Sequence, residues 1–272
     1  MKSKHIHHDV HRAHLSYPVS LVQRLYSIFL GPLLVVGLML VAVRFFAITP
    51  GLHEIISVHD LLLAAALTIG RIGLAYALAV IVAIPLALLV TKNSFTEKIF
   101  LPSFDILQSV PILAFFPILI LIFIRFGFLN GAAIFILFLS MLWNIVFTLV
   151  GGLKIIPVDI TYAARVFGLK GFAYFDKMIL PAIIPQLVTG SILAVAQGWN
   201  IIIVAEVLHV YIPGGTSADD LFGLGSLLVR ASANGQTQLF MVAVAVMVFI
   251  IALVNFFVWQ KLLKYAQRFR FE

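Results

Sequence analysis

Six long apolar runs constrain this chain more than any other feature of its sequence. They cover, to within a few residues, positions 25–48, 61–90, 101–124, 130–150, 181–208 and 238–259. A helix needs about 20 apolar residues to cross the hydrocarbon core of a bilayer, and each run is long enough to do so. Hydrophobic residues make up 62% of the 272 residues and charged residues only 11%, so lipid must surround most of the chain. We therefore predict an all-α, polytopic membrane protein with about six transmembrane helices.

Prolines mark the irregular points in these runs. Pro85 lies in the second run, which Arg71 also interrupts, and Pro111 and Pro117 lie in the third. Proline removes a backbone donor and clashes with the preceding turn, so the third run is the one that we expect to divide into two pieces. No small-residue cleavage pattern accompanies the first run, and we interpret it as a span rather than a cleaved signal peptide.

Basic residues are distributed unevenly between the segments that join the spans. Of the 18 Lys and Arg residues, 14 fall in one alternating set of segments, while only Arg44, Arg125 and Arg230 fall in the opposite set. Segments rich in Lys and Arg normally remain in the cytoplasm. We therefore predict one transmembrane domain at 25–260, flanked by cytoplasmic tails at 1–24 and 261–272.

Composition also excludes several kinds of site. The chain has no cysteine, so it has no thiol for a disulfide, a zinc site or nucleophilic catalysis. It contains no G-x-x-x-x-G-K-[ST] loop, so the sequence shows no P-loop for binding nucleotide phosphates. The net charge of +7 follows membrane topology, and we do not interpret it as a nucleic-acid surface. We expect a polar tail rather than a metal site from the N-terminal histidines, which are His5, His7, His8, His11 and His14.

The segment at about 152–180 is short, charged and rich in turns, although it lies between two long apolar runs. Asp159 favours the N-terminus of a short helix, predicted at 159–167, and Gly168 is a natural stop. One face of this helix carries Ile160, Ala163, Ala164 and Phe167. The pattern alone leaves two interpretations. The segment is either a hairpin lying at the lipid interface or an element that docks into a groove on a partner.

The same segment resembles the signature of ABC-importer permeases, which reads E-A-A, three residues, G, nine residues, I, one residue, L-P. Five positions match at the right spacing, namely Ala163, Ala164, Gly168, Leu180 and Pro181. Two positions depart, because Tyr162 replaces the Glu of the signature and Met178 replaces its Ile. The resemblance implies a loop that couples the chain to an ATPase through Tyr162, Ala163, Ala164, Phe167, Gly168, Leu180 and Pro181. The Tyr162 exchange removes a charge that such a loop can use against the ATPase.

Other segments resemble the nitrate, sulfonate, taurine and bicarbonate branch of these permeases. They are LTIGRIGLAYALAVIVAIPLALLV, LQSVPILAFFPILILIF, WNIIIVAEVL and GLGSLLVRA. The resemblance implies the type I (MetI-like) permease fold in a bacterial inner membrane. It further implies a second permease copy, a periplasmic or lipid-anchored binding protein, and separate ATPase subunits that bind ATP and Mg²⁺. No cofactor is expected on this chain, and the solute is expected to be a small anion of the kinds that name the branch.

Polar side chains inside the apolar runs are candidates for a translocation path or gate, because they are costly at membrane depth. The uncharged candidates are Gln108, Asn144, Gln197 and Asn200, and the charged ones are Arg71 and Glu206. For the amides, hydrogen bonding between helices is the competing interpretation. For Arg71 and Glu206 we predict a polar network near the outer gate, and independent snorkelling of the two side chains is the alternative.

Two further features concern packing and the outer face. Gly190, Ala194 and Gly198 form a small-residue stripe that suits either packing within the chain or a dimer axis. The segment at 211–237 is expected outside, with an interfacial helix at about 221–233. That helix either contacts a binding protein or serves as a connector.

Two other classes of protein compete with an importer subunit. An ion-coupled secondary transporter predicts paired acids within the spans and an inverted repeat, and neither is visible in the sequence. A membrane scaffold without transport leaves the proline-broken run and the docking helix without a purpose. The importer interpretation accounts for both features.

Overall fold

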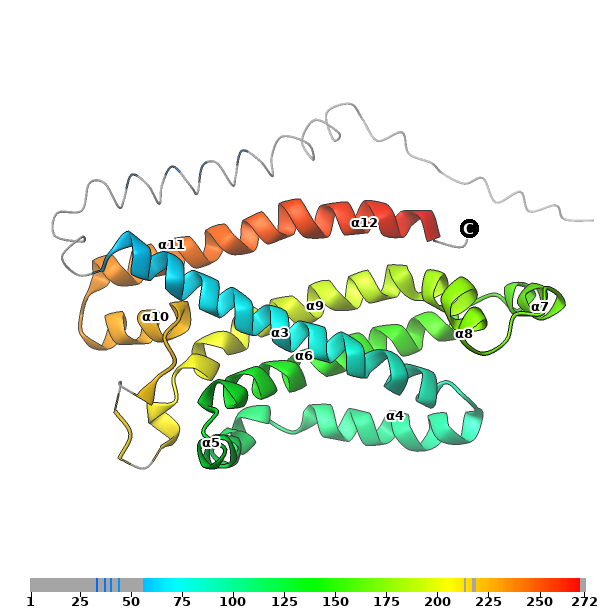
Figure 1. Cartoon of the computed structure of the whole chain (residues 1–272), viewed down its shortest axis with the longest axis horizontal. Coiled ribbons are helices and arrows are strands. Elements are labelled where there is room, and N and C mark those ends of the chain that lie inside the picture. The colour runs from blue at the N-terminus through cyan, green and yellow to red at the C-terminus, as the bar shows by residue number, and fades with distance from the viewer. Residues whose placement is uncertain are drawn as a thin grey trace, which may run out of the picture.

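The computed structural model describes residues 56–212, 214–216 and 219–269, together with the isolated positions Leu33, Gly37, Leu40 and Arg44. The N-terminal tail with its histidines and residues 270–272 lie outside the described residues. So does the predicted first span, except for those four isolated positions. The described part is a bundle of long helices (Figure 1).

Four long helices build the bundle: α3 (Val58–Val90), α6 (Leu129–Lys154), α9 (Leu180–Glu206) and α11 (Thr237–Val254). The shorter helices are α4 (Ser94–Ser109), α5 (Phe116–Arg125), α7 (Val158–Val166), α8 (Gly171–Tyr174), α10 (Leu224–Ala233) and α12 (Gln260–Ala266). The 3-10 turns are η1 (Ile112–Phe115), η3 (His209–Tyr211) and η6 (Gln267–Phe269), and the π-helical turns are η2 (Phe175–Ile179) and η5 (Asn255–Trp259). Within the described residues, four helical stretches are long and apolar enough to cross a membrane, and α4 with η1 and α5 makes a fifth.

The predicted division of the third run is confirmed. α4 and the η1–α5 segment meet at a bend of 74°. Val110 precedes Pro111 and has an extended backbone, because the proline ring disfavours the helical conformation of the residue before it. Pro117 falls in the first turn of α5, where a missing backbone donor costs nothing. Pro85, by contrast, lies inside α3, which continues to Val90.

The core forms where α6 packs against both α3 and α9. Ala75, Ala79, Ala83 and Ala87 recur every four residues on α3 and are completely buried. Small side chains at this interval let two helices approach closely, since membrane helices associate mainly through packing contacts. The apolar residues of α6 fill the space that these alanines leave, so α3, α6 and α9 form the central layer of the bundle.

Among the described residues, the segments predicted to be cytoplasmic lie at one end of the bundle. Lys154 at the end of α6 pairs with Glu97 near the start of α4, at 2.6 Å. α7 and α8 lie at this same end, and α5 and α10 lie at the opposite end (Figure 1). The arrangement agrees with the alternation on which the charge argument depends.

The small-residue stripe of α9 packs within the chain. A Cβ atom added at Gly190 would overlap the Thr148 hydroxyl, and one added at Gly198 would overlap the terminal methyl of Met141. Thr148 and Met141 both belong to α6. Ala194, between the two glycines, is completely buried. The stripe therefore serves the α6–α9 contact rather than a dimer axis.

Filling this contact is expected to destabilise the chain. We predict that Gly198→Val lowers the free energy of unfolding by about 1–3 kcal/mol, because the Met141 side chain must leave its place. Denaturation in detergent micelles measures the effect. Ala196→Val is the matched control, since Ala196 is exposed on the same helix. Equal stability of the two variants would contradict the packing account.

Candidate functional site

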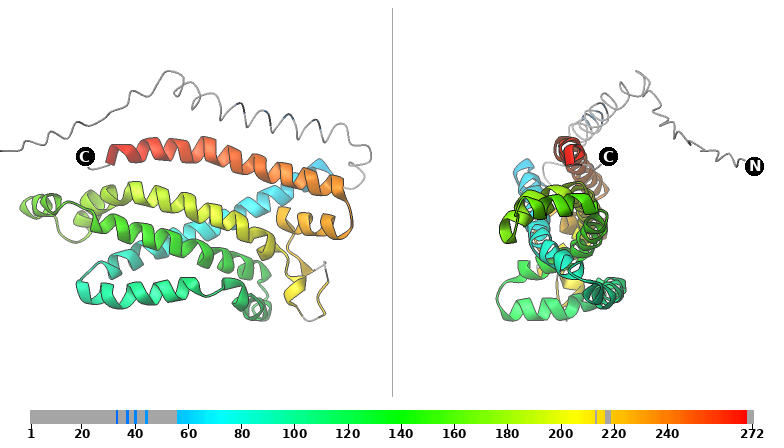
Figure 2. Two further views of the ribbon diagram at one scale, coloured as in Figure 1. Left: turned by 180° about the vertical axis from the view of Figure 1, so that it is seen from behind. Right: turned by 90° about the vertical axis from the view of Figure 1, so that its right-hand side faces the viewer.

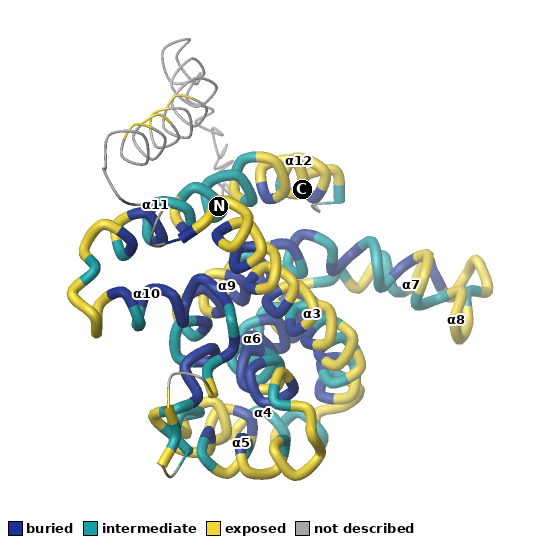
Figure 3. The backbone as a smooth tube through the Cα atoms, turned by 60° about the vertical axis from the view of Figure 1, so that its left-hand side comes forward, coloured by how far each residue is buried: buried dark blue, intermediate teal, exposed yellow. Residues whose placement is uncertain are grey.

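The predicted coupling loop forms a helix that stands away from the bundle. α7 covers Val158–Val166, within one residue of the predicted helix. Figure 2 and Figure 3 both show α7 and α8 projecting beyond the ends of α6 and α9. Gly168 has a positive φ of 69°, and its N–H donates to the carbonyl of Arg165 at 3.0 Å. The left-handed glycine therefore ends the helix and turns the chain back, as the signature requires.

Side chains divide the α7 segment into an outward and an inward face. Tyr162 is 57% exposed and Phe167, the residue after the helix, is 81% exposed. Ala164 is buried and lines a hollow of about 400 Å³ between α7 and the start of α9. Ala163 and Pro181 line the same hollow, whereas Leu180 is half-buried as the first residue of α9. Phe167 also borders this hollow, but its side chain stays largely exposed, so both aromatic side chains are accessible to a partner.

Tyr162 makes a contact that the Glu of the signature could not make in the same way. The guanidinium of Arg165 lies over its ring, 5.9 Å from the centroid. Such a cation–π contact at an exposed site contributes roughly 0.5–1 kcal/mol. Tyr162 therefore holds Arg165 on the outward face through its ring instead of through an ion pair.

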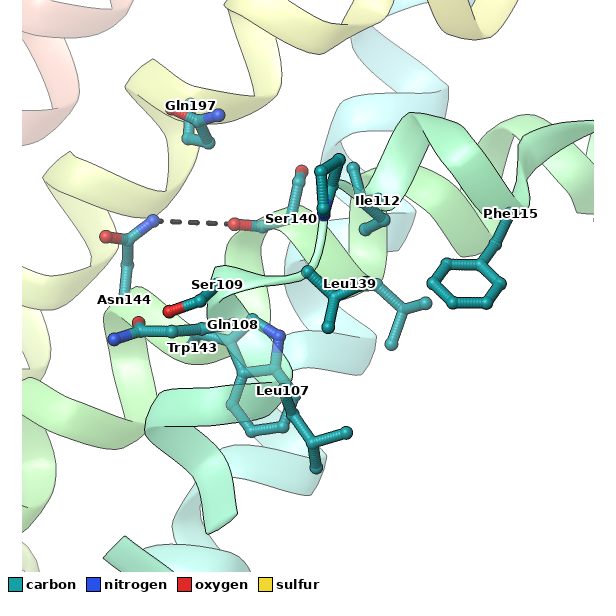
Figure 4. Close-up of a pocket in the computed structure, with 12 residues that line it drawn as sticks. Leu107, Gln108, Ser109, Ile112, Phe115, Leu139, Ser140, Trp143, Asn144 and Gln197 are labelled. Atoms are coloured by element: carbon teal, nitrogen blue, oxygen red, sulfur yellow. Dashed lines mark hydrogen bonds between the residues drawn. The ribbon is translucent and has the colours of Figure 1, made fainter. Parts of the chain in front are cut away.

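Three of the predicted path residues meet at a second hollow, of about 540 Å³, near the break in the third span. Gln108 comes from α4, Asn144 from α6 and Gln197 from α9 (Figure 4). The Asn144 amide donates to the carbonyl of Ser140 at 3.4 Å. The lining of the hollow also includes Pro111, Trp143 and two serines, and none of the lining residues is charged. Amide and hydroxyl groups therefore face an apolar wall here, which is typical of a site for a small polar solute.

Asn200 does not join this hollow. It lies three residues beyond Gln197 on α9, is exposed, and donates its amide to the carbonyl of Ala196 at 3.2 Å. Gln108 on α4 lines the hollow, and Asn200 is not among the lining residues. Of the four uncharged candidates for the path, Asn200 is thus the one that lies outside this hollow.

Arg71 and Glu206 form a buried ion pair at the end of the bundle opposite α7. The Arg71 guanidinium donates to Glu206 Oε1 at 2.7 Å, and the two side chains are 7% and 0% exposed. Independent snorkelling of the two residues is therefore wrong. Arg71 also donates to the Asn130 side chain at 2.9 Å and to the carbonyl of Phe222 at 3.0 Å. The pair joins α3 to α6, to α9 and to the segment before α10.

Two further groups complete the partners of Glu206. The Thr68 hydroxyl donates to Oε1 at 2.7 Å, and the backbone N–H of Gly225 donates to Oε2 at 2.7 Å. Gly223 leaves room for the carboxylate, which a Cβ atom at that position would overlap. The Glu206 carboxylate thus binds the first turn of α10, and its negative charge interacts favourably with the positive end of the helix dipole. This helix, predicted at about 221–233, ends at Ala233 as expected but begins three residues later than predicted, at Leu224.

Sequence reasoning missed Thr68, Asn130 and the two glycines. Thr68 and Glu206 are separated by 138 positions along the chain, and no spacing rule connects them. The glycine pair in FGLGS was the available signal, because glycine allows close approach of a backbone to a charged group. No group of three or more His, Asp or Glu side chains suited to a metal ion occurs among the described residues.

The fold and these sites define a class of protein. The chain is a bundle of membrane-spanning helices, with α7 and α8 protruding at one end and α10 bonded to Glu206 at the other. A polar hollow lies between the two ends. This combination is typical of a membrane transport subunit. Residues 79–264 match the family described as the binding-protein-dependent transport system inner membrane component. The match covers well over half of the chain, and the chain belongs to this family of ABC-importer permeases, which has the MetI-like fold.

Curated relatives come from the branch that the sequence motifs resemble. The chain is 32% identical over 161 residues to the nitrate import permease protein NrtB of Leptolyngbya laminosa, covering 59% of this chain and 57% of the relative. It is 32% identical over 147 residues to the bicarbonate transport system permease protein CmpB of a Synechocystis species, covering 54% and 51%. It is also 32% identical over 148 residues to the putative aliphatic sulfonates transport permease protein SsuC of Escherichia coli, covering 54% and 51%. The chain thus spans little more than half the length of these relatives.

Proposed function

We propose that this chain is the membrane-spanning subunit of an ATP-driven importer for a small solute that a binding protein delivers. Its partners are ATPase subunits, which bind ATP and Mg²⁺, a substrate-binding protein, and a second permease copy. No nucleotide or metal is held by this chain itself. Both termini lie in the cytoplasm of a bacterial cell, and the residues at 152–180 face the ATPase.

One observation carries this proposal above the others. A continuous helical stretch from Gly171 to Glu206 joins the three candidate sites. It begins beside the protruding α7, passes Gln197 at the polar hollow, and ends at Glu206 with its hydrogen-bond partners. A displacement imposed on α7 by a closing ATPase is therefore transmitted along one rigid element to the hollow and then to the outer end.

The hollow suggests how a solute passes. Gln108, Asn144 and Gln197 offer hydrogen bonds but no fixed charge, so the solute is held weakly and is released readily. The named relatives support a small oxyanion, such as nitrate, bicarbonate or an aliphatic sulfonate. Selection among these belongs to the binding protein, because this lining has no cation to pair with an anion.

Reconstitution tests the proposal directly. The chain is combined in proteoliposomes with candidate ATPase and binding-protein subunits from the same organism, and uptake of labelled nitrate, bicarbonate and taurine is measured. Uptake of one of them is expected only with ATP and all partners present. Uptake of all three without ATP would overturn the proposal in favour of another class of transporter.

The amides of the hollow should matter for the same uptake. We predict that the double variant Asn144→Leu with Gln197→Leu lowers the uptake rate about tenfold, since two hydrogen bonds to the solute are lost. Assembly with the ATPase is expected to remain intact. Gln260→Leu is the control, because Gln260 is an exposed glutamine on α12, away from the hollow. Equal uptake by the two variants would remove the hollow from the path.

A further inference from the structure

Polar side chains recur along one face of α9, with the exposed Leu193 between them. Thr189, Gln197 and Asn200 are exposed, and Gln186 is half-buried on the same face. They lie within a sector of about 80° around the helix, so they share one side of it. Amides and hydroxyls are costly in contact with lipid. These polar positions are therefore suited to water and solute. They run from the hollow at Gln108, Asn144 and Gln197, here called the outer hollow, toward the coupling loop.

α6 carries a matching line. Ser140, Asn144 and Thr148 follow one another at intervals of four residues. The first two line the outer hollow together with Gln197. Thr148 lines a separate hollow of about 480 Å³ with Gln186 and Thr189, nearer to the cytoplasmic end. The same pair of helices thus builds two polar hollows in series.

Gln186 has an unsatisfied group in this inner hollow. Its Oε1 is buried and has no hydrogen-bond partner among the described residues. Gly152 makes room for the side chain, since a Cβ atom there would lie 2.6 Å from Gln186 Cγ. An unsatisfied buried polar group costs about 1–3 kcal/mol. The amide is thus placed for a partner that the protein alone does not supply.

The threonines leave further acceptors free. The Thr148 hydroxyl donates to the carbonyl of Asn144 at 2.8 Å, and the Thr189 hydroxyl donates to that of Pro185 at 3.0 Å. Each hydroxyl oxygen retains lone pairs that can accept from a solute or its water. With the Gln186 amide as donor and acceptor, the hollow offers hydrogen bonds of both kinds. None of the residues that line it is charged.

Phe269 connects this hollow with the coupling loop. It belongs to η6, which packs against α9, and its ring lies 5.2 Å from that of Tyr265. Phe269 lines the inner hollow and also the hollow beneath α7, whose lining includes Ala163 and Ala164. The ring is therefore in a position to respond when α7 moves.

We propose that the inner hollow is a second solute position on the path, that it takes a small polar solute through Gln186, Thr148 and Thr189, and that Phe269 is its cytoplasmic cover. This inference rests on the proposed function and adds to it a waiting position and an exit residue. Because the hollow has no fixed charge, a solute leaves it when the cover opens. Movement of α7 opens the cover by displacing Phe269.

A single thiol tests this assignment, because the natural chain has no cysteine. Thr189→Cys is introduced into the chain assembled with its ATPase in inside-out vesicles, and a charged thiol reagent that does not cross membranes is added. The introduced thiol is expected to react, and Phe269→Ala is expected to raise the rate about tenfold by removing a cover that is closed most of the time. Phe269→Leu keeps apolar bulk and should leave the rate near that of the parent. Leu78→Cys, at an exposed apolar position on α3, should not react.

Uptake by the same preparations separates a solute position from a wet crevice. Reaction at Thr189→Cys is expected to stop uptake, and reaction at Lys92→Cys, in an exposed turn, is expected to leave it unchanged. An importing complex in which Thr189→Cys is as unreactive as Leu78→Cys overturns the inner position and leaves the proposed function standing. A rate unaffected by Phe269→Ala overturns the cover. A complex that imports nothing overturns the proposed function, and this inference with it.

Discussion

Replacing Arg71 by methionine is expected to lower the free energy of unfolding by about 3–5 kcal/mol, because it leaves a charged carboxylate in the interior without its partner. Glu206 is completely buried, and its remaining hydrogen bonds come from the Thr68 hydroxyl and the Gly225 N–H. Those neutral donors cannot balance a full charge. Denaturation in detergent micelles measures the loss, and the outer helix α10 should be the first element to become accessible to protease.

Two comparisons isolate the ion pair. Arg125→Met removes an exposed arginine and is expected to change stability by no more than about 0.5 kcal/mol. The double variant Arg71→Met with Glu206→Leu removes both charges and should recover much of the loss. If Arg71→Met proves as stable as Arg125→Met, the pair does not hold the outer end of the bundle together.

Replacing Phe167 by aspartate is expected to weaken ATPase binding by about 2 kcal/mol or more, roughly a factor of 30 in affinity. An exposed aromatic at the end of the protruding helix α7 is the kind of residue that anchors an interface, and a carboxylate there cannot enter an apolar groove. ATP-driven uptake should fall in parallel. Folding of the chain should be unaffected, since the side chain is 81% exposed.

Phe95→Asp is the matched control for this variant. Phe95 lies in the first turn of α4, at the same end of the bundle, and is 73% exposed. It makes no part of the α7 segment, so its replacement should leave ATPase binding and uptake unchanged. Equal loss in both variants would indicate a general effect of charge at this end of the protein rather than a docking contact.

Periodicity and charge predicted the elements of this fold well, because spans in lipid must satisfy their own backbone and therefore appear as long apolar runs. The break at Pro111, the short α7 and the stop at Gly168 follow from local backbone chemistry. The partners of Arg71 could not be predicted in this way. Asn130, Phe222 and Glu206 come from three distant segments, and only the packed bundle brings them together.

The polar path residues show the same limit. Gln197 and Asn200 share a helical face, and the sequence offers no reason to separate them. The hollow includes Gln197 but not Asn200, and α4 lines it at Gln108 just before the bend in the third span. Likewise, the stripe at Gly190 and Gly198 suits any close helix pair, and the choice of α6 as its partner depends on the three-dimensional arrangement.

ATP-dependent uptake in proteoliposomes, with the parent chain and Phe167→Asp measured side by side, tests the central claim most directly. That claim is that movement enters this protein through α7 from a separate ATPase. The account predicts uptake by the parent that requires the ATPase, the binding protein and hydrolysable ATP, and almost none by Phe167→Asp at the same protein level. Uptake by the parent chain without any ATPase, or undiminished uptake by Phe167→Asp, would contradict it.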